Sequence, residues 1–289
     1  MSEISRRADA KINAFLRVLG RRDDGYHQIE SLVLPVSLHD VIVVRPGEGL
    51  SVSVVADRQD PLEGAGGENL ALVAARALAE AAALAHPEAE IVIEKTIPVS
   101  AGLGGGSADA AATLRALNQL WRCGFDDQGL ARVGARVGSD VPAQLAGGAV
   151  FVHGRGDLAE PVNVKPTTWV ILPMPFPVRT PDAYAWWDEE GTTGPDPGAL
   201  IAAAETGNHE LLGSALFNDL QAPVSSRHPQ VQAAVESFRR AGALGEVMTG
   251  SGPTVAALAR DQDHAEELAA AVPGSIVVSA PPPTESDAG

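Results

Sequence analysis

A run of glycines between residues 98 and 112 is the strongest chemical signal in the sequence. It reads Pro98-Val-Ser-Ala-Gly-Leu-Gly-Gly-Gly-Ser-Ala-Asp-Ala-Ala and continues into Ala112. Such a segment can take positive φ repeatedly and lets a ligand approach bare backbone. It joins a strand-like run at 89–94 to a helix-like run at 108–121, and a helix N-terminus favours an anion. Strand, glycine loop and helix in this order predict a phosphate-binding site.

The loop fits neither of the two commonest phosphate motifs. A dinucleotide pattern begun at Gly102 would need glycine at 107, where the chain has Ser107, and the Gly-Lys pair of a Walker A loop occurs nowhere. A tight packing turn is the alternative, although four glycines in five positions exceed what a turn needs. Ser107 can offer a hydroxyl to a phosphate or to Mg²⁺, whereas Asp109 is expected only to complement the helix dipole.

Lysine is rare in this chain, which makes Lys11 and Lys95 candidates for chemistry. Residues 10–20 alternate with period two, which predicts a half-buried strand with Lys11 and Asn13 side by side on its more polar face. A compact ammonium suits a phosphate or an activated hydroxyl. For Lys95, chance retention of a few lysines in an arginine-rich chain remains an equal explanation.

Asp140 and the pair Tyr26-His27 are further candidates. Asp140 lies in Ser139-Asp-Val-Pro142, where a helix N-cap is the better interpretation of the residue taken alone. Tyr26 and His27 follow Gly25 in a turn-rich loop, a place from which ligands are often bound. The other histidines show no metal-ligand spacing and no Ser-His-Asp arrangement is evident, so we assign no metal ligands.

Composition narrows the class of protein. The chain has 289 residues, of which 45% are hydrophobic and 20% charged, which is typical of a globular protein of one or two domains. Its net charge of −16 disfavours nucleic acid as a partner. Cys123 is the single cysteine, so no intrachain disulfide can form. No apolar run could span a bilayer and no signal peptide is evident, so we expect a cytoplasmic protein without a membrane partner.

Polar and glycine-rich connections separate the predicted helices, strands and domains of the chain. Residues 68–85 predict an uninterrupted helix after a polar, glycine-rich connection at 57–67. A change of character around 155–166 indicates a boundary between domains at 1–160 and 161–289. Residues 209–218 predict another helix. A second glycine turn, Gly250-Ser-Gly-Pro253, lies between two predicted strands, and residues 280–289 are expected to form a disordered tail.

Three segments together resemble the GHMP kinases, a superfamily of kinases acting on metabolites such as galactose, homoserine and mevalonate. They are the glycine loop, Ala10-Lys-Ile-Asn-Ala-Phe-Leu16 and Thr249-Gly-Ser-Gly-Pro-Thr254. The resemblance implies an α+β fold of two domains. The N-terminal domain would hold a left-handed βαβ unit, an exception to the usual handedness, and the C-terminal domain would be ferredoxin-like.

Lys11-Ile-Asn13, Asp24-Gly-Tyr-His27 and Gly138-Ser-Asp-Val-Pro142 resemble one branch of this superfamily more narrowly. That branch implies ATP-dependent phosphorylation of the tertiary 2-hydroxyl of a cytidine-diphosphate-linked methylerythritol, a step of non-mevalonate isoprenoid synthesis. ATP would be the co-substrate, with Mg²⁺ expected. The protein would act as a monomer or homodimer.

The resemblance also assigns roles to single residues. Lys11 and Asp140 match the catalytic lysine and aspartate, and Asn69 and Lys95 match positions near the adenine. The positions that match the ATP-phosphate loop are Pro98, Val99, Ser100, Ala101, Gly102, Leu103, Gly104, Gly105, Gly106, Ser107 and Ala108. The positions that match the acceptor site are Asn13, Tyr26, His27, Tyr184, Gly250, Ser251 and Gly252. Ser100 and Asp109 depart from the family pattern, in which glycine or alanine, and asparagine, are more usual.

Two other functions remain open. The chain could be another GHMP kinase, for example of homoserine or mevalonate, although the Gly-Tyr-His loop argues against this. It could also be a non-catalytic nucleotide-binding sensor on the same fold, which the presence of both Lys11 and Asp140 disfavours.

Overall fold

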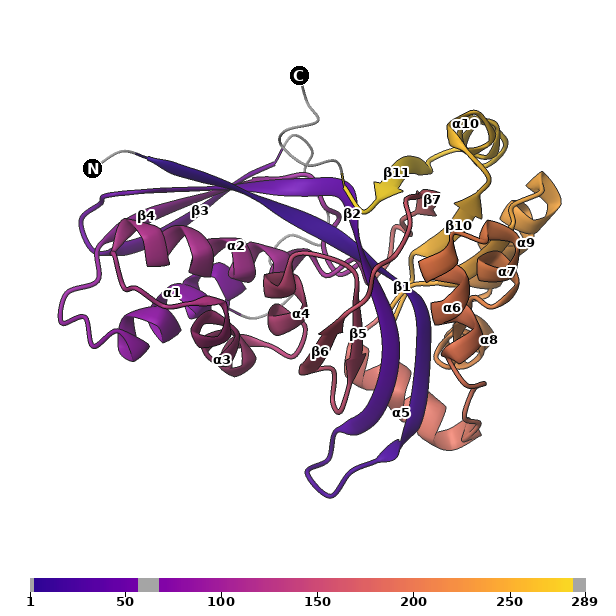
Figure 1. The fold of residues 1–289 in the computed structure, drawn as a ribbon, viewed down its shortest axis with the longest axis horizontal. Helices are drawn as coiled ribbons and strands as arrows, with labels where there is room; N and C mark the ends of the chain where they lie inside the picture. Colours follow the sequence, from indigo (N-terminus) through magenta and orange to yellow (C-terminus); the bar gives the residue numbers. More distant parts are fainter. Residues whose placement is uncertain (1–2, 57–67, 283–289) are drawn as a thin grey trace. The chain divides into compact units, whose positions relative to one another are not determined.

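The computed structural model describes residues 3–56 and 68–282, and the chain divides into two compact units. Unit 1 holds the residues up to Ala10, Leu38–Val99 and Gly104–Gly147; unit 2 holds Lys11–Ser37, Ser100–Leu103 and the chain from Gly148 on. Strands β1 (Ile4–Arg21) and β2 (His27–Arg45) are long enough to run through both units (Figure 1). The domain boundary near residue 160 stays a prediction. The connection at 57–67 and most of the expected tail lie outside the described residues.

Unit 1 packs helices against strands through small side chains. β3 (Leu50–Ala56) pairs in parallel with β4 (Ala89–Lys95), and β4 pairs antiparallel with β2. The helices are α1 (Leu70–Ala81), α2 (Gly105–Leu120), α3 (Asp127–Val137) and α4 (Val141–Ala146). Buried alanines of α1 and α2 let these helices approach closely over the apolar strand residues. Because α1 lies between the parallel strands β3 and β4 in the chain, the implied βαβ unit is present; its left-handed sense remains a prediction.

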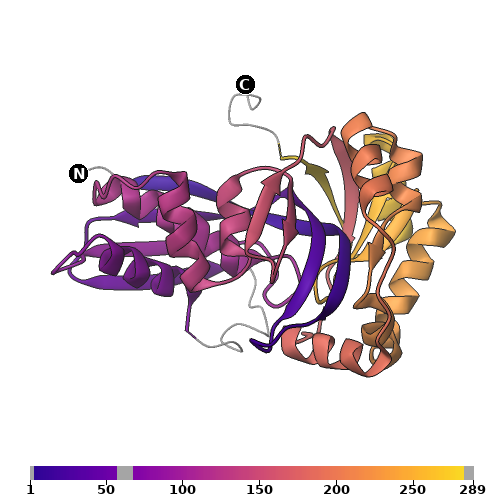
Figure 2. The same ribbon diagram turned by 60° about the horizontal axis from the view of Figure 1, so that its bottom comes forward.

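Unit 2 contains a second, antiparallel sheet in the order β11-β7-β10-β9. Its strands are β7 (Thr167–Leu172), β9 (Gly245–Met248), β10 (Val255–Ala259) and β11 (Ile276–Ala280). α9 (Pro229–Ala241) precedes β9 and α10 (Gln262–Ala271) precedes β11, and the two helices pack on each other and on the sheet (Figures 1 and 2). This β-α-β-β-α-β order confirms the ferredoxin-like prediction.

Unit 2 also contains further helices and three short strands that pair with β1, with β2 or with each other. β5 pairs with β2 and with β6, while β8 pairs in parallel with β1. They are β5 (Val150–His153), β6 (Leu158–Pro161), α5 (Thr180–Glu190), α6 (Gly198–Thr206), α7 (His209–Ser214), β8 (Phe217–Asn218) and α8 (Gln221–Arg227). The helix predicted at 209–218 is therefore too long, because its last two residues pair with β1 as strand β8.

The predictions for residues 10–20 and 68–85 also need correction. The strand at 10–20 exists within β1, but it is not half-buried: Lys11 and Asn13, on the expected polar face, are only 6% and 5% exposed. The alternation of polar and apolar residues cannot reveal this burial, because residues far along the chain cover the polar face of the strand. The helix predicted at 68–85 ends at Ala81, and Ala83 has a positive φ of 52°, a conformation that ends helices.

Candidate active site

The glycine loop has the backbone of an anion-binding turn. Ser100, Gly102 and Gly104 take positive φ of 54°, 78° and 70°, so left-handed residues alternate along it. Gly104 is the N-cap of α2, and Gly105 begins the helix. The first four N–H groups of an α-helix have no acceptor within the helix, and alternating handedness turns successive N–H groups toward one side. The loop can therefore offer several backbone donors to a phosphate.

Packing explains one of these glycines directly. A Cβ on Gly102 would lie 2.6 Å from the Thr249 carbonyl oxygen and 2.8 Å from that of Gly252. The second glycine turn thus lies against the first, and Thr254 N–H donates to the Ala101 carbonyl at 3.4 Å. For Gly102 the packing explanation therefore holds, and its role in phosphate binding stays a prediction.

Lys11 and Asn13 meet both glycine turns inside unit 2. Lys11 Nζ lies 2.7 Å from Asn13 Oδ1 and 3.1 Å from the Gly102 carbonyl oxygen, and its backbone N–H donates to Leu103. The Asn13 N–H donates to Thr249 Oγ1 at 2.8 Å, while Asn13 Nδ2 donates to Ser31 at 2.7 Å. Both side chains are buried, so these contacts fix the ammonium and the amide in one orientation.

Asn218 is a residue of this site that the sequence did not reveal. Its Nδ2 donates to the carbonyls of Met248 and Gly250, at 2.5 and 2.8 Å, on either side of Thr249. Asn218 therefore holds the turn that presents Thr249 to Asn13. No local pattern could indicate this role, because it depends on a contact across 30 residues of chain.

His27 and Tyr184 come together, as expected for neighbouring parts of one site. Their rings stack with centroids 4.8 Å apart, and Trp187 meets His27 edge-on at 5.9 Å. His27 Nε2 lies 2.7 Å from Asp188 Oδ1. Tyr26 is 55% exposed, and the Arg155 guanidinium lies 5.3 Å from its ring centroid. Trp187, Asp188 and Arg155 were not predicted from the sequence.

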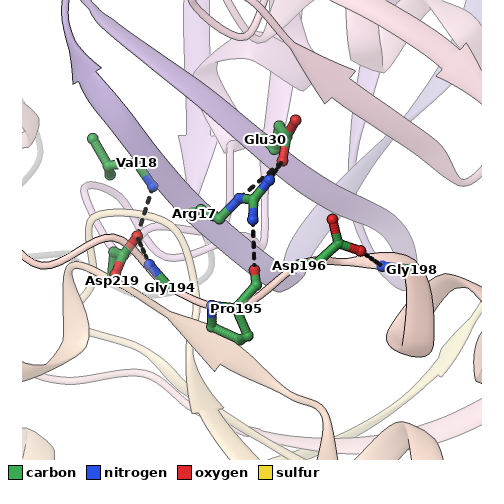
Figure 3. A network of polar contacts seen from close by, with 8 residues as sticks. All are labelled: Arg17, Val18, Glu30, Gly194, Pro195, Asp196, Gly198 and Asp219. Atoms are coloured by element: carbon green, nitrogen blue, oxygen red, sulfur yellow. Dashed lines mark hydrogen bonds and ion pairs between the residues drawn. The ribbon is translucent and has the colours of Figure 1, made fainter.

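A polar network ties the segment after α5 to β1 (Figure 3). Asp219 Oδ2 accepts the N–H groups of Val18 at 2.7 Å and Gly194 at 3.1 Å. Arg17 binds Glu30 at 2.6 Å and the Pro195 carbonyl at 3.1 Å. Burial raises the pKa of Asp219, while the two N–H donors act in the opposite direction. The network fixes the chain segment that follows α5.

Asp140 occupies the N-cap position of α4, but its side chain does not cap the helix. Its backbone carbonyl accepts the Gln144 N–H at 3.1 Å, and the side chain is half-buried. The cap interpretation of its carboxylate is therefore wrong. Asn69 does cap a helix: its Oδ1 accepts the Ala71 N–H at 2.9 Å at the start of α1.

Lys95 forms a buried ion group with Asp40 and Asp109 in unit 1. Its Nζ lies 2.6 Å from Asp40 Oδ2 and 2.7 Å from Asp109 Oδ2. Burial lowers the pKa of Lys95, but the attraction of Asp109 and Asp40 outweighs it and raises that pKa overall. Burial raises the pKa of Asp109 to about 7 against the opposing effect of Lys95. The expectation that Asp109 merely complements the helix dipole is wrong.

Among residues 3–56 and 68–282, no three histidine, cysteine or acidic side chains gather as metal ligands. None of the helices in those same ranges is long and apolar enough to cross a membrane.

Family comparisons agree with this architecture. Residues 69–148 match the GHMP kinases N terminal domain, and residues 200–276 match the GHMP kinases C terminal domain. The first match includes the glycine loop and Asp140, and the second includes the glycine turn at 250–253. The chain belongs to the GHMP kinases and is an ATP-dependent small-molecule kinase.

Individual relatives can be compared with the chain in sequence and in structure. A protein of Symbiobacterium thermophilum named 4-diphosphocytidyl-2-C-methyl-D-erythritol kinase is 42% identical over 262 residues, 90% of this chain and 92% of the relative. A crystal structure of 4-(cytidine 5'-diphospho)-2C-methyl-D-erythritol kinase is 33% identical, with a TM-score of 0.79 over 96% of this chain and 99% of the other. L. major mevalonate kinase is 17% identical with a TM-score of 0.75 over 96% of each chain, which shows a shared fold alone.

Gly102→Ala should strongly impair the kinase without unfolding it. The new Cβ would meet two carbonyl oxygens within 3 Å at a positive φ, so the loop must shift. A displacement of about 1 Å can reduce turnover about 10²-fold. Steady-state kinetics with circular dichroism checks this. Gly124→Ala is the control, since Gly124 also has a positive φ, of 76°, but nothing within 4 Å. An equal loss of turnover in both variants would contradict the explanation that the new Cβ displaces the loop.

The wild-type protein should lose stability relative to Asp109→Asn as pH rises from about 4 to about 7. The pKa of Asp109 lies at about 7 instead of 3.8. Between those values the folded state therefore binds a proton that the unfolded state has lost. This stabilising contribution is complete below the unfolded pKa and disappears as pH passes the folded one. Urea unfolding across that range measures it; a constant difference between the two proteins would refute it.

Proposed function

We propose that this kinase transfers the γ-phosphoryl group of ATP to the tertiary 2-hydroxyl of 4-diphosphocytidyl-2-C-methyl-D-erythritol. The observation that carries the proposal is the 42% identity, over nearly the whole chain, to a relative of that name. The stacked pair of His27 and Tyr184 beside the exposed Tyr26 supports an aromatic base as part of the acceptor.

Asp140 is proposed as the base. A tertiary alcohol is a weak nucleophile, and a positioned carboxylate that accepts its proton contributes about 10²–10⁴-fold in rate. The side chain of Asp140 is not used as a helix cap, which supports a role outside the helix. Lys11 would orient the hydroxyl and favour the developing alkoxide charge. Its fixed contacts with Asn13 and Gly102 support such preorganisation.

The nucleotide would bind along residues 98–108, with Asn69 and Lys95 near the adenine. Phosphoryl transfer depends mainly on positioning and on neutralising phosphate charge. The left-handed residues of the loop and the N-terminus of α2 suit that task. Mg²⁺ bound with ATP would supply further charge neutralisation. Because Mg²⁺ prefers oxygen ligands, keeps several waters and often needs few protein ligands, the Ser107 hydroxyl fits it without an acidic cluster.

The acceptor would be held by the turn and loop residues of unit 2. Tyr26, His27 and Tyr184 would bind the cytosine ring by stacking and hydrogen bonding. Asn13 and the turn Gly250-Ser251-Gly252 would contact the methylerythritol diphosphate, where backbone donors suit an anion. Thr180 Oγ1 lies 3.0 Å from Ser251 Oγ, which orients this turn from α5.

The purified protein should release ADP with 4-diphosphocytidyl-2-C-methyl-D-erythritol and not with homoserine or mevalonate. A coupled ADP assay with equal concentrations of each acceptor decides between them. Phosphorus NMR of the product should show a new phosphomonoester. Turnover of homoserine or mevalonate but not the cytidyl compound would favour a sister kinase, and ATP binding without any turnover would favour a sensor.

Asp140→Asn should reduce kcat by about 10²–10⁴-fold while ATP affinity is retained, because only proton acceptance is removed. Stopped assays with direct measurement of ATP binding separate the two effects. Asp127→Asn is the matched control: the same chemical change in the same unit, on a side chain that is 79% exposed. A nearly normal kcat in Asp140→Asn would remove Asp140 as the base.

A further inference from the structure

The buried group of Asp40, Lys95 and Asp109 connects three elements of unit 1. Asp40 lies on β2, Lys95 ends β4, and Asp109 is the fifth residue of α2. The Asp40 side chain is 0% exposed and that of Asp109 is 7% exposed, so their attraction to Lys95 is only weakly screened. Two carboxylates share one ammonium, which leaves one excess negative charge when all three groups are ionised.

Asp40 also binds the peptide that precedes the glycine loop. Its Oδ1 accepts the N–H groups of Thr96 at 2.6 Å and Ile97 at 2.8 Å. Pro98, the first residue of the proposed phosphate loop, follows directly. One carboxylate therefore holds both the Lys95 ammonium and the backbone leading into the loop.

Asp109 and Gly105 join the same group to the helix that follows the loop. Asp109 Oδ2 binds Lys95, one turn after the N-terminus of α2. A Cβ on Gly105 would lie 3.1 Å from Lys95 Nζ and 3.0 Å from Ile97 Cγ2. The first residue of α2 thus lies directly on Lys95 and on the segment that Asp40 holds.

Stability alone explains this group poorly. Well-packed apolar residues often stabilise a fold as well as a buried ion group does. Here burial raises the pKa of Asp109 to about 7, so keeping the second carboxylate charged is unfavourable. What the group supplies is geometry: short, directional contacts to the segments on both sides of the loop.

We infer that Asp40, Lys95 and Asp109 are positioning residues, which hold Thr96–Ile97 and the first turn of α2 in the geometry that binds the phosphates of a nucleoside triphosphate. This inference rests on the proposed function for the identity of the nucleotide, ATP. The three side chains act through the backbone that they hold, so their loss should weaken nucleotide binding more than acceptor binding.

Calorimetric binding of ATP with Mg²⁺ to the full chain tests the inference. Asp40→Asn and Asp109→Leu should each raise the Kd for ATP about tenfold, while KM for the acceptor changes less than about twofold. Asp109→Asn should retain affinity, because its amide oxygen can still accept from Lys95.

Leu120→Ala is the control for a general loss of stability, since Leu120 is buried at the opposite end of α2. Unchanged ATP affinity in Asp40→Asn, or equal weakening in Leu120→Ala at the same loss of stability, would overturn the inference. If Asp40→Asn does not fold, Asp109→Leu against Asp109→Asn decides it. A wild-type protein that binds ATP but does not phosphorylate the cytidyl compound would contradict the proposed acceptor only, and the ATP comparison would still stand.

Discussion

The close approach of two glycine turns is the constraint on which unit 2 depends. Gly102 has no room for a Cβ beside the carbonyl oxygens of Thr249 and Gly252. Because the backbones meet so closely, Lys11 reaches the Gly102 carbonyl while Thr249 reaches the Asn13 N–H. One side chain, Asn218, holds the carbonyls on either side of Thr249. Segments near residues 11, 102, 218 and 250 are therefore joined by close packing and hydrogen bonds.

Unit 1 shows how an acidic protein can prepare a place for an anion. The chain carries a net charge of −16, which repels phosphate at long range. Locally, the backbone N–H groups at the start of α2 are donors of the kind that favour an anion. These are fixed dipoles, and their effect depends on geometry more than on net charge. The contacts of Asp40 and Lys95 show why the geometry of that segment is closely held.

Residues with proposed roles occur in both units. Unit 1 holds the N-terminus of α2 and Asp140, whereas unit 2 holds Lys11 and the aromatic residues around His27. The glycine loop passes from unit 1 to unit 2 and back, and β1 changes unit between Ala10 and Lys11. The chain itself therefore links the segments to which phosphate binding and acceptor binding are assigned.

The sequence by itself determined the features that depend on local chemistry. Glycine spacing identified the loop before α2, and the combined motifs identified the family and, through that resemblance, the ferredoxin-like domain. Only the tertiary structure decided that Lys11 and Asn13 are buried, that Asp109 is an ion-pair partner of Lys95, and that Asn218 holds the Gly250 carbonyl. Each of these depends on contacts between residues far apart in the chain. Hydrophobic periodicity indicates which face of a strand is apolar. It does not indicate which residues, far away in the chain, cover the other face.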